Sequence, residues 1–363
     1  MPSPKSRRPN ERIKRKYLDF QRLALGRSDA SISATAEALH RFEHYTSHRD
    51  FKRFHIEQAK GFRDHLAKAV NARTGEKLSA ATVTSILTAL KRFFAWLAME
   101  PGYRRVLTPA DADYFTPTAR DTRTATARRD RPVPSLEQVR AVLERMPAET
   151  DIEKRDRALI AFLILTGARD GALVTFKLKH LDVAASRLEQ DARDVATKRA
   201  KTFTTFFFPV GDDIKAIVAE WVRFLRTEKL WGENDPLFPA TETGIDAAGG
   251  FHAVGLARQH WTSAGPVRKV VRAAFEAAGL PYANPHSFRN TLVQLAYKLQ
   301  LPPEAFKAWS QNLGHEDALT TFTSYGTLPV HRQGEVMRGI GEGREIAEGE
   351  IKAAIATLAK LRR

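Results

Sequence analysis

The chain has 363 residues, of which 58 are Lys or Arg, 42 are Asp or Glu and none is Cys. Its length suggests about two domains of roughly 150 residues each, and its composition is that of an ordinary globular protein. The absence of cysteine excludes disulfides, thiolate nucleophiles and Cys-ligated metal sites. Because no apolar run is long enough for a membrane span or a signal peptide, we expect a cytoplasmic protein without a membrane partner.

The positive charge is concentrated in the first third of the chain. Residues 1–131 contain 27 Lys and Arg against 14 Asp and Glu, which is +13 of the total formal charge of +16. Such an asymmetry is typical of a domain that binds a polyanion, because each neutralised phosphate releases condensed counterions. Nucleic acid is therefore the expected partner.

Three amphipathic patterns in the same region predict helices. The clearest follows Ser79, a good N-cap, and repeats apolar residues at spacings of three and four as far as Leu97. Weaker patterns lie at residues 33–45 and 56–70. This part of the chain is predicted to divide into a basic tail at 1–28, a helical domain at 29–116 that binds nucleic acid, and a basic linker at 117–134.

The second domain, predicted at 135–343, is expected to be mainly helical with a small β-sheet. It opens with a capping box at Ser135 and Gln138, and the apolar run at 158–165 predicts a buried helix. β-Branched and aromatic residues at 194–210 predict a β-hairpin with its turn at 197–201. Further helical patterns lie at 214–225, 267–278, 285–299, 303–313 and 317–327.

Two later segments stand apart from this helical pattern, one inside the second domain and one at the end of the chain. Residues 241–266 have no clear period and are predicted to be a long loop, to which we assign no role. Residues 344–363 form a last amphipathic pattern with charged flanks, which predicts a helix that either packs on its own domain or is donated to a neighbouring protomer.

The motif N-P-H-S-F-R contains the first group of candidate site residues. Asn284 is a good N-cap and Pro285 a good first helical residue, so His286 and Arg289 are predicted to share one face of the first helical turn. The N–H groups and the dipole at a helix start favour phosphate. The next helix is predicted to end in L-G-H, with Gly314 as its C-cap.

The remaining candidates stand in a fixed order around this motif: Arg169 in T-G-A-R after the buried helix, Lys198 in the hairpin turn, His315 in L-G-H and Tyr325 ten residues later. This ordered set resembles the tyrosine recombinase (phage integrase) family. The likeness extends upstream, because the basic helical domain is similar to the family's core-binding domain. It implies a two-domain, C-shaped clamp on DNA, with a core-binding domain and a catalytic domain.

The resemblance also implies an activity, which is site-specific DNA recombination or integration through a 3′-phosphotyrosyl intermediate and a Holliday junction. A phage or another mobile element would use this activity. Attack by tyrosine on a phosphodiester requires neutralisation of the non-bridging oxygens, help with the phenolic proton and a proton for the departing 5′ oxygen. The implied roles are phosphate binding for Arg169, Arg289 and His315, assistance at the nucleophile or phosphate binding for His286, general acid for Lys198, and nucleophile for Tyr325.

The resemblance further implies that no metal or other cofactor is needed, because the phosphotyrosyl link keeps the energy of the phosphodiester. The expected partners are double-stranded DNA, three further copies of the chain in a synaptic homotetramer, and accessory DNA-bending or directionality proteins. Exchange of residues 344–363 between protomers would fit such a tetramer. Bound to DNA, the protein would associate with the nucleoid.

Several alternatives stay open. Lys201 is the alternative general acid, and the alternative functions are a type IB topoisomerase-like enzyme and a non-catalytic DNA-binding protein. The chain departs from the family pattern at Ala172, where an acidic residue is frequent, and at Asn290, where a second histidine is frequent. Other residues are expected to be structural or on the surface: Tyr297, Phe306, Trp309, His180, His252 and His260.

Overall fold

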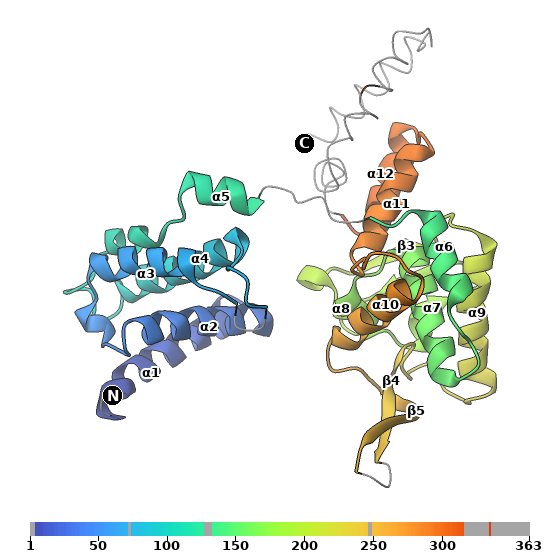
Figure 1. The fold of residues 1–363 in the computed structure, drawn as a ribbon, viewed down its shortest axis with the longest axis horizontal. Helices are drawn as coiled ribbons and strands as arrows, with labels where there is room; N and C mark the ends of the chain where they lie inside the picture. The colour runs from blue at the N-terminus through green and yellow to red at the C-terminus, as the bar shows by residue number, and fades with distance from the viewer. Residues whose placement is uncertain (1–3, 72–73, 127–132, 246–248, 316–333, 335–363) are drawn as a thin grey trace. The chain divides into compact units, whose positions relative to one another are not determined.

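The computed structural model describes residues 4–71, 74–126, 133–245, 249–315 and 334. The chain divides into two compact units, Met1–Asp130 and Arg131–Arg363, which are called the first and second unit (Figure 1). Each has its own hydrophobic core. Within the described part, no helix has the length and apolar character needed to cross a membrane.

The first unit is helical, as its apolar periodicity predicts. Its elements are α1 (Pro4–Asp19), the π-helical turn η1 (Phe20–Ala24), α2 (Asp29–Tyr45), η2 (Phe51–Arg53), α3 (Ile56–Lys68), α4 (Ala80–Leu97), η3 (Pro109–Phe115) and α5 (Ala119–Thr126).

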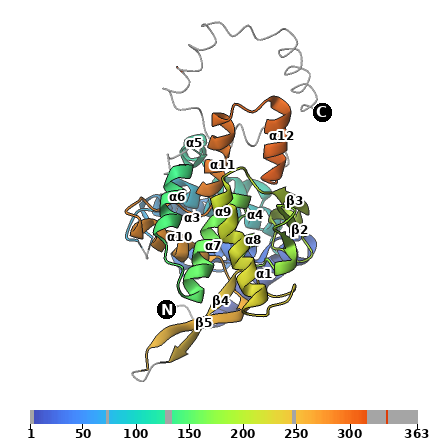
Figure 2. The ribbon, with the colours of Figure 1, turned by 90° about the vertical axis from the view of Figure 1, so that its right-hand side faces the viewer.

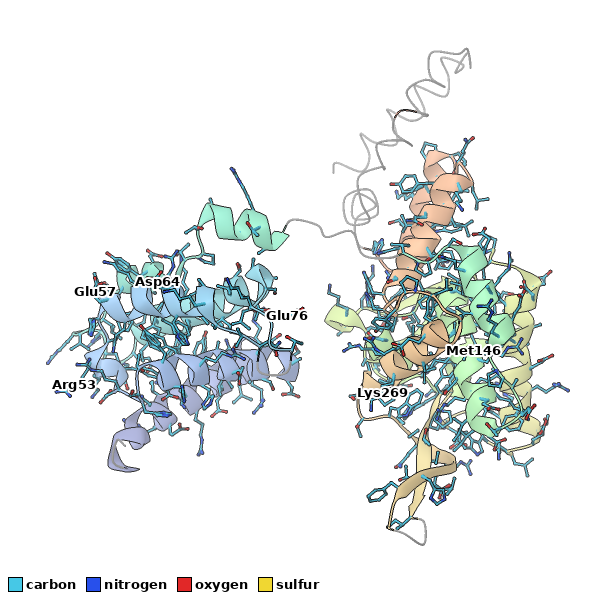
Figure 3. The ribbon with its side chains drawn as sticks, in the orientation of Figure 1. Arg53, Glu57, Asp64, Glu76, Met146 and Lys269 are labelled. Atoms are coloured by element: carbon cyan, nitrogen blue, oxygen red, sulfur yellow. The ribbon has the colours of Figure 1, made fainter. Side chains whose placement is uncertain are left out.

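The core of the first unit is built from aromatic rings. Phe42 meets Phe62, Phe94 and Phe115 edge to face at centroid distances of 5.2 to 5.4 Å, a favoured geometry for aromatic pairs. The side-chain oxygen of Ser79 accepts a hydrogen bond from the Thr82 N–H, which confirms the predicted N-cap of α4. Charged side chains such as Glu57 and Asp64 stay exposed on α3 (Figure 3).

The structure corrects the predicted tail at 1–28. Most of it is helical, and Ile13 and Tyr17 of α1 are buried in the core of the first unit. The Asn10 side chain donates to the Arg49 carbonyl and accepts from the Phe51 N–H, so it fixes the chain between α2 and η2. Tertiary contacts thus order a segment whose own sequence is mostly polar and basic.

The predicted linker at 117–134 is also partly corrected. Its first half forms α5, which packs against α4 within the first unit. The division between the two units falls after Asp130, inside the predicted linker.

The second unit is mainly helical with small sheets, as predicted. Its helices are α6 (Leu136–Arg145), α7 (Asp151–Thr166), α8 (Asp170–Leu173), η4 (Leu178–His180), η5 (Lys198–Ala200), α9 (Asp212–Thr227), α10 (Gly265–Ala277), α11 (Ser287–Lys298) and α12 (Pro303–Asn312). The capping box of Ser135 and Gln138 is confirmed at the start of α6.

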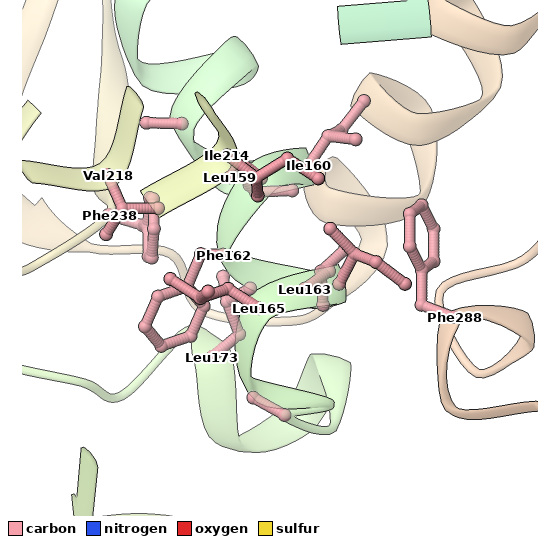
Figure 4. Packing of buried hydrophobic residues seen from close by; sticks show 14 of the residues in the cluster. Leu159, Ile160, Phe162, Leu163, Leu165, Leu173, Ile214, Val218, Phe238 and Phe288 are labelled. Carbon is pink, nitrogen blue, oxygen red and sulfur yellow. The ribbon is translucent and has the colours of Figure 1, made fainter. Parts of the chain in front are cut away.

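Helix α7 is the centre of this unit, since every residue from Ala158 to Thr166 is buried. Figure 4 shows Leu159 and Phe162 among the neighbouring side chains Val218 and Phe238. A helix that is apolar on all sides must be covered on all sides, which explains the continuous run in the sequence.

A three-stranded antiparallel sheet, in the order β1-β2-β3, follows α8 and η4 in the chain. Its strands are β1 (Leu181–Asp182), β2 (Arg187–Gln190) and β3 (Phe203–Phe206). The predicted hairpin is therefore present, but its first strand lies earlier than the aromatic run at 194–210. The connection from β2 to β3 contains η5, so Lys198 lies in the turn as expected.

The predicted loop at 241–266 is instead a second antiparallel hairpin, β4 (Pro239–Ile245) with β5 (Phe251–His260). It projects from the helices of the second unit (Figure 2). The buried Arg155 of α7 holds its base by donating to the Pro239 carbonyl and, at 2.9 Å, to the Thr241 hydroxyl.

Candidate active site

Arg289, on the first turn of α11, is the best-fixed of the predicted site residues. Its side chain is 2% exposed. One terminal nitrogen donates to the Gly167 carbonyl at 2.5 Å, and the other donates to the Leu313 carbonyl at 2.6 Å and lies 3.0 Å from Nε2 of His315. The guanidinium therefore joins three segments that are far apart in the sequence, which are the turn after α7, the start of α11 and the turn after α12.

Both turns depend on a glycine in the left-handed region. Gly167 (φ +60°) ends α7 and Gly314 (φ +70°) follows α12. A Cβ on Gly167 would lie 2.9 Å from Leu313, and a Cβ on Gly314 would lie 2.6 Å from the ring of Phe203. The chain packs too closely here for any side chain, which explains why T-G-x-R and L-G-H each contain glycine.

The start of α11 differs from the sequence prediction. The helix begins at Ser287 with His286 as its N-cap residue, and the His286 side chain makes no capping hydrogen bond. Asn284 and Pro285 precede the helix, where the Asn284 carbonyl accepts from the Ser287 N–H. His286 and Arg289 still belong to one turn, since the Arg289 N–H donates to the His286 carbonyl at 3.1 Å.

Arg169 is the N-cap residue of the short helix α8 and is half-buried. Its carbonyl accepts from the N–H groups of Ala172 and Leu173. Ala172 is buried in the core, so this position supplies packing where an acidic residue would supply charge. Asp170 brings a carboxylate beside Arg169, and it binds Arg268 of α10 at 2.8 Å.

The two histidines lie in a strongly positive environment. Burial, and after it the charges of Arg289 and Arg169, lowers the pKa of His315 to about 3. His286 reaches solvent, yet desolvation by the surrounding protein, followed by Arg289 and Arg169, lowers its pKa as well, while Asp170 opposes the shift. Both rings are therefore neutral at pH 7, so each offers one donor and one acceptor nitrogen.

The charges of both candidate lysines reach these rings. Lys198 acts on the pKa of His286, whereas Lys201 acts on the pKa of His315. Lys198 is exposed in η5, and Nζ of Lys201 lies 5.8 Å from the ring centre of Phe203. The structure thus brings Arg169, Lys198, His286, Arg289 and His315 to one region, and Lys201 with them. Tyr325 lies outside the described residues.

Asn312 is a supporting residue that sequence reasoning missed. Its side-chain amide accepts from the Phe206 N–H at 2.6 Å and donates to the Phe206 carbonyl at 2.8 Å. The main-chain carbonyl of Asn312 accepts from the Thr205 hydroxyl. The end of α12 thus occupies the free edge of β3 and fixes the hairpin beside L-G-H. The ion pair of Asp170 with Arg268 was also missed, although Asp170 directly follows the T-G-A-R motif.

Four of the residues that we expected to be structural or on the surface pack within the second unit. Phe306 and Trp309 belong to the core of the second unit, and the Tyr297 ring contacts Phe306 at 5.3 Å. His180 is buried, and its Nδ1 accepts from the Lys177 N–H. Across the part of the chain that the structure describes, no three His, Asp or Glu side chains gather as metal ligands would.

These residues therefore form a positively charged cluster whose donors suit a phosphate-like anion. Two guanidinium groups, two neutral imidazoles and two lysines supply donors and positive charge. The hydrogen bonds of Arg289 to the Gly167 and Leu313 carbonyls fix one of the guanidinium groups in place. Such pre-arranged donors stabilise charge that develops on phosphoryl oxygens.

The sequence of the chain was compared with those of known proteins and protein families. No family model matches the chain. Over 252 residues, which are 68% of this chain and 72% of the relative, it is 27% identical to the tyrosine recombinase XerC of Lactobacillus delbrueckii subsp. bulgaricus.

Solved structures agree with the fold. A lambda integrase dimer bound to a COC′ core site matches with a TM-score of 0.59 at 14% identity, over 88% of this chain and 99% of that one. XerH bound to a palindromic difH substrate matches with 0.57 at 18% identity, over 86% and 80%. The Tn1549 transposon integrase in complex with transposon right end DNA matches with 0.55 at 14% identity, over 91% and 99%. In sequence and in fold, the chain resembles the tyrosine recombinases, which confirms the resemblance that its ordered motif predicts.

Proposed function

We propose that the chain is a site-specific DNA recombinase that cleaves and rejoins DNA through a covalent 3′-phosphotyrosyl link. The arrangement of Arg289 is the observation that carries this proposal. Its buried guanidinium is held by two carbonyls and, among the described residues, by no carboxylate. A buried charge without a counter-ion is costly, and a DNA phosphate would supply the missing negative charge.

The site residues divide the chemistry between them. Arg169, Arg289 and His315 would bind the non-bridging oxygens, and the neutral His286 would accept the phenolic proton or bind an oxygen. The Tyr325 oxygen attacks phosphorus, the bond to the 5′ oxygen breaks, and Lys198 transfers a proton to that oxygen. The free 5′ hydroxyl of a partner strand would then attack the phosphotyrosyl phosphorus and give its proton to Lys198. The bond from phosphorus to the Tyr325 oxygen would break and this oxygen would regain its proton, so no external energy source is needed.

The first test traps the covalent intermediate. The protein is incubated with nicked and fragmented DNA from its host, the reaction is quenched with SDS, and the DNA that stays attached to protein is sequenced. The test variant is Tyr325→Phe, and the matched control is Tyr297→Phe, which makes the same chemical change at a ring that packs against Phe306. Adducts at one repeated sequence, lost only with Tyr325→Phe, are the expected result.

Two other results would overturn the proposal. Adducts scattered over unrelated sequences and lost with Tyr325→Phe would indicate an enzyme that relaxes DNA, of the type IB topoisomerase kind. Tight DNA binding without adducts on any nicked substrate would indicate a DNA-binding protein without catalysis.

The assembly is part of the same proposal. Four copies would pair two DNA sites and pass through a Holliday junction, and residues 344–363, which lie outside the described residues, would be exchanged between neighbouring copies. Deletion of 344–363 should then weaken pairing of two sites and leave binding to one site intact, whereas loss of folding would contradict the exchange. Accessory DNA-bending proteins would act on the same complex, in the cytoplasm at the nucleoid.

A further inference from the structure

One carboxylate in the loop that carries Lys198 forms a cluster of ion pairs with the body of the second unit. This loop, residues 191–202, connects β2 to β3. Asp194 accepts from Nζ of Lys179 at 2.7 Å and from Nζ of Lys177 at 3.3 Å, and it lies 3.6 Å from Nε2 of His180. Three side chains from η4 and the residue before it thus surround a single acidic group in the loop.

His180 is oriented toward this carboxylate by the backbone. Its Nδ1 accepts from the Lys177 N–H at 2.9 Å, so Nε2 carries the proton of the neutral ring and faces Asp194. The residue is 4% exposed, and burial lowers the pKa of His180. Hydrogen bonds from Lys179 and Lys177 lower the pKa of Asp194, so its carboxylate is ionised at neutral pH.

Two further contacts follow Asp194 in the loop. Val195 is buried in the core of the second unit, and the Ala196 N–H donates to the Thr175 hydroxyl at 3.0 Å. That hydroxyl donates in turn to the Ala172 carbonyl at 2.8 Å. Because the Ala172 N–H donates to the Arg169 carbonyl, the loop is connected through three hydrogen bonds to the turn that carries Arg169.

Lys198 comes two residues after the last of these contacts, and Ala200 adopts a positive φ of 52° before the chain enters β3. The first half of the loop is therefore fixed, and the position of Lys198 depends on that fixed half. Proton transfer requires the donor nitrogen within hydrogen-bond reach of the leaving oxygen, so a displacement of about 1 Å is enough to slow the reaction.

We propose that Asp194 is a positioning residue, which holds the loop on Lys177, Lys179 and His180 so that Lys198 reaches the 5′ oxygen of the scissile phosphate. The inference rests on the proposed function, because only in that reaction does Lys198 act as a general acid. It assigns to Asp194 no contact with DNA.

The test separates positioning of the general acid from general damage to the site. In ordinary DNA the bond from phosphorus to the 5′ oxygen breaks, and that oxygen takes a proton from Lys198. In DNA with sulfur at the 5′ bridging position, the bond from phosphorus to sulfur breaks and the thiolate leaves without a proton, because thiols are far stronger acids than alcohols. A variant that lacks only the proton transfer should therefore cleave the sulfur substrate normally.

The test variants are Asp194→Asn and, as a milder change at an exposed side chain, Lys179→Gln. Lys198→Ala sets the size of the effect for complete loss of the acid, which for general acids is about 10²- to 10⁴-fold. The matched control is Asp191→Asn, in the same loop, whose carboxylate binds Arg193 and not the η4 side chains. Formation of the covalent adduct is followed by SDS gel with each variant on both substrates.

We expect Asp194→Asn to slow adduct formation on ordinary DNA by about 10- to 100-fold, Lys179→Gln to slow it less, and both to react within about twofold of the parent chain on the sulfur substrate. Asp191→Asn should match the parent on both. Equal losses on the two substrates, or no loss on ordinary DNA, would overturn the assignment of Asp194. If the parent chain itself formed no adduct on either substrate, the proposed function would fail, and this result is distinct from the other two.

Discussion

Replacement of Gly314 by alanine should destabilise the second unit by about 2–5 kcal/mol. The backbone at Gly314 has φ +70°, and an added Cβ would lie 2.6 Å from Phe203 Cζ. The left-handed conformation costs an alanine about 1–2 kcal/mol, and overpacking against a fixed ring costs about 1–3 kcal/mol more. Phe203 cannot easily retreat, because the following residues of β3 are bound to Asn312.

Gly279 provides a control with the same backbone geometry. It follows α10 with φ +71°, and nothing lies within 4 Å of the Cβ that alanine would add. Both glycines close the same kind of turn, since the Gly279 N–H donates to the Glu276 carbonyl as the Gly314 N–H donates to the Gln311 carbonyl. Gly279→Ala should therefore cost only the conformational part, about 1–2 kcal/mol.

The assay is urea unfolding followed by tryptophan fluorescence. Four of the five tryptophans lie in the second unit, so a Trp96→Phe background makes the emission report on that unit alone. The difference between the two alanine variants should be about 1–3 kcal/mol, and only Gly314→Ala should also slow DNA cleavage, because it displaces His315. Equal destabilisation by the two variants would refute the close approach of Phe203 to the L-G-H turn.

Three further predictions follow from the charge and hydrogen bonding of the site. Arg289→Lys should lower the rate of adduct formation by about 100-fold or more, because one ammonium cannot replace a guanidinium that binds two acceptors at once. Arg268→Lys, in an exposed ion pair, should have little effect on this rate. Comparable rates for the two variants would contradict the prediction. Since the folded-state pKa of His315 is about 3, the unfolded chain binds a proton that the folded chain does not between about pH 6.5 and 3, so the free energy of unfolding should fall as the pH is lowered through this window. His315→Gln should flatten that pH dependence in urea titrations, and an unchanged slope would count against the lowered pKa. The affinity of the chain for duplex DNA should fall by about 10³- to 10⁵-fold between about 50 and 200 mM salt if roughly six to ten phosphates are contacted. The Tyr325→Phe variant should bind DNA as tightly as the parent chain. A Kd that does not change with salt would refute an electrostatic interface.

The elements that the sequence predicts well are those whose burial leaves a local pattern. Helix α4 is amphipathic and was predicted with its N-cap, Ser79. Helix α7 was predicted only over its apolar second half, residues 158–165, and its charged start after the N-cap Thr150 was not. The five described site residues were predicted from the resemblance of their ordered motifs to the tyrosine recombinase family, and the structure brings them to one region. The order of these motifs along the chain carried the prediction, since His286 and Arg289 alone are a weak signal.

The elements that were missed are those stabilised by distant parts of the chain. Helix α1 has few apolar residues, and its place in the core depends on Ile13, Tyr17 and the contacts of Asn10 with the chain near Phe51. The hairpin of β4 and β5 has solvent on both faces over most of its length, so it lacks the alternation that one buried face would impose. Its anchor, Arg155, lies more than 80 residues earlier on α7.

The geometry of Arg289 explains why two motifs 147 residues apart have the same design. Gly167 and Gly314 each follow a helix and each close a turn, and the Gly167 and Leu313 carbonyls in these turns are the acceptors of the same guanidinium. An L-residue with a side chain in either turn would move its carbonyl away, and Arg289 would lose an acceptor in a place where water cannot replace it. T-G-x-R, H-x-x-R and L-G-H are therefore one hydrogen-bonded unit in space. In the proposed reaction this unit would hold the positive charge of Arg289 in place before DNA binds, so the cost of ordering the arginine would fall on folding and not on the transition state.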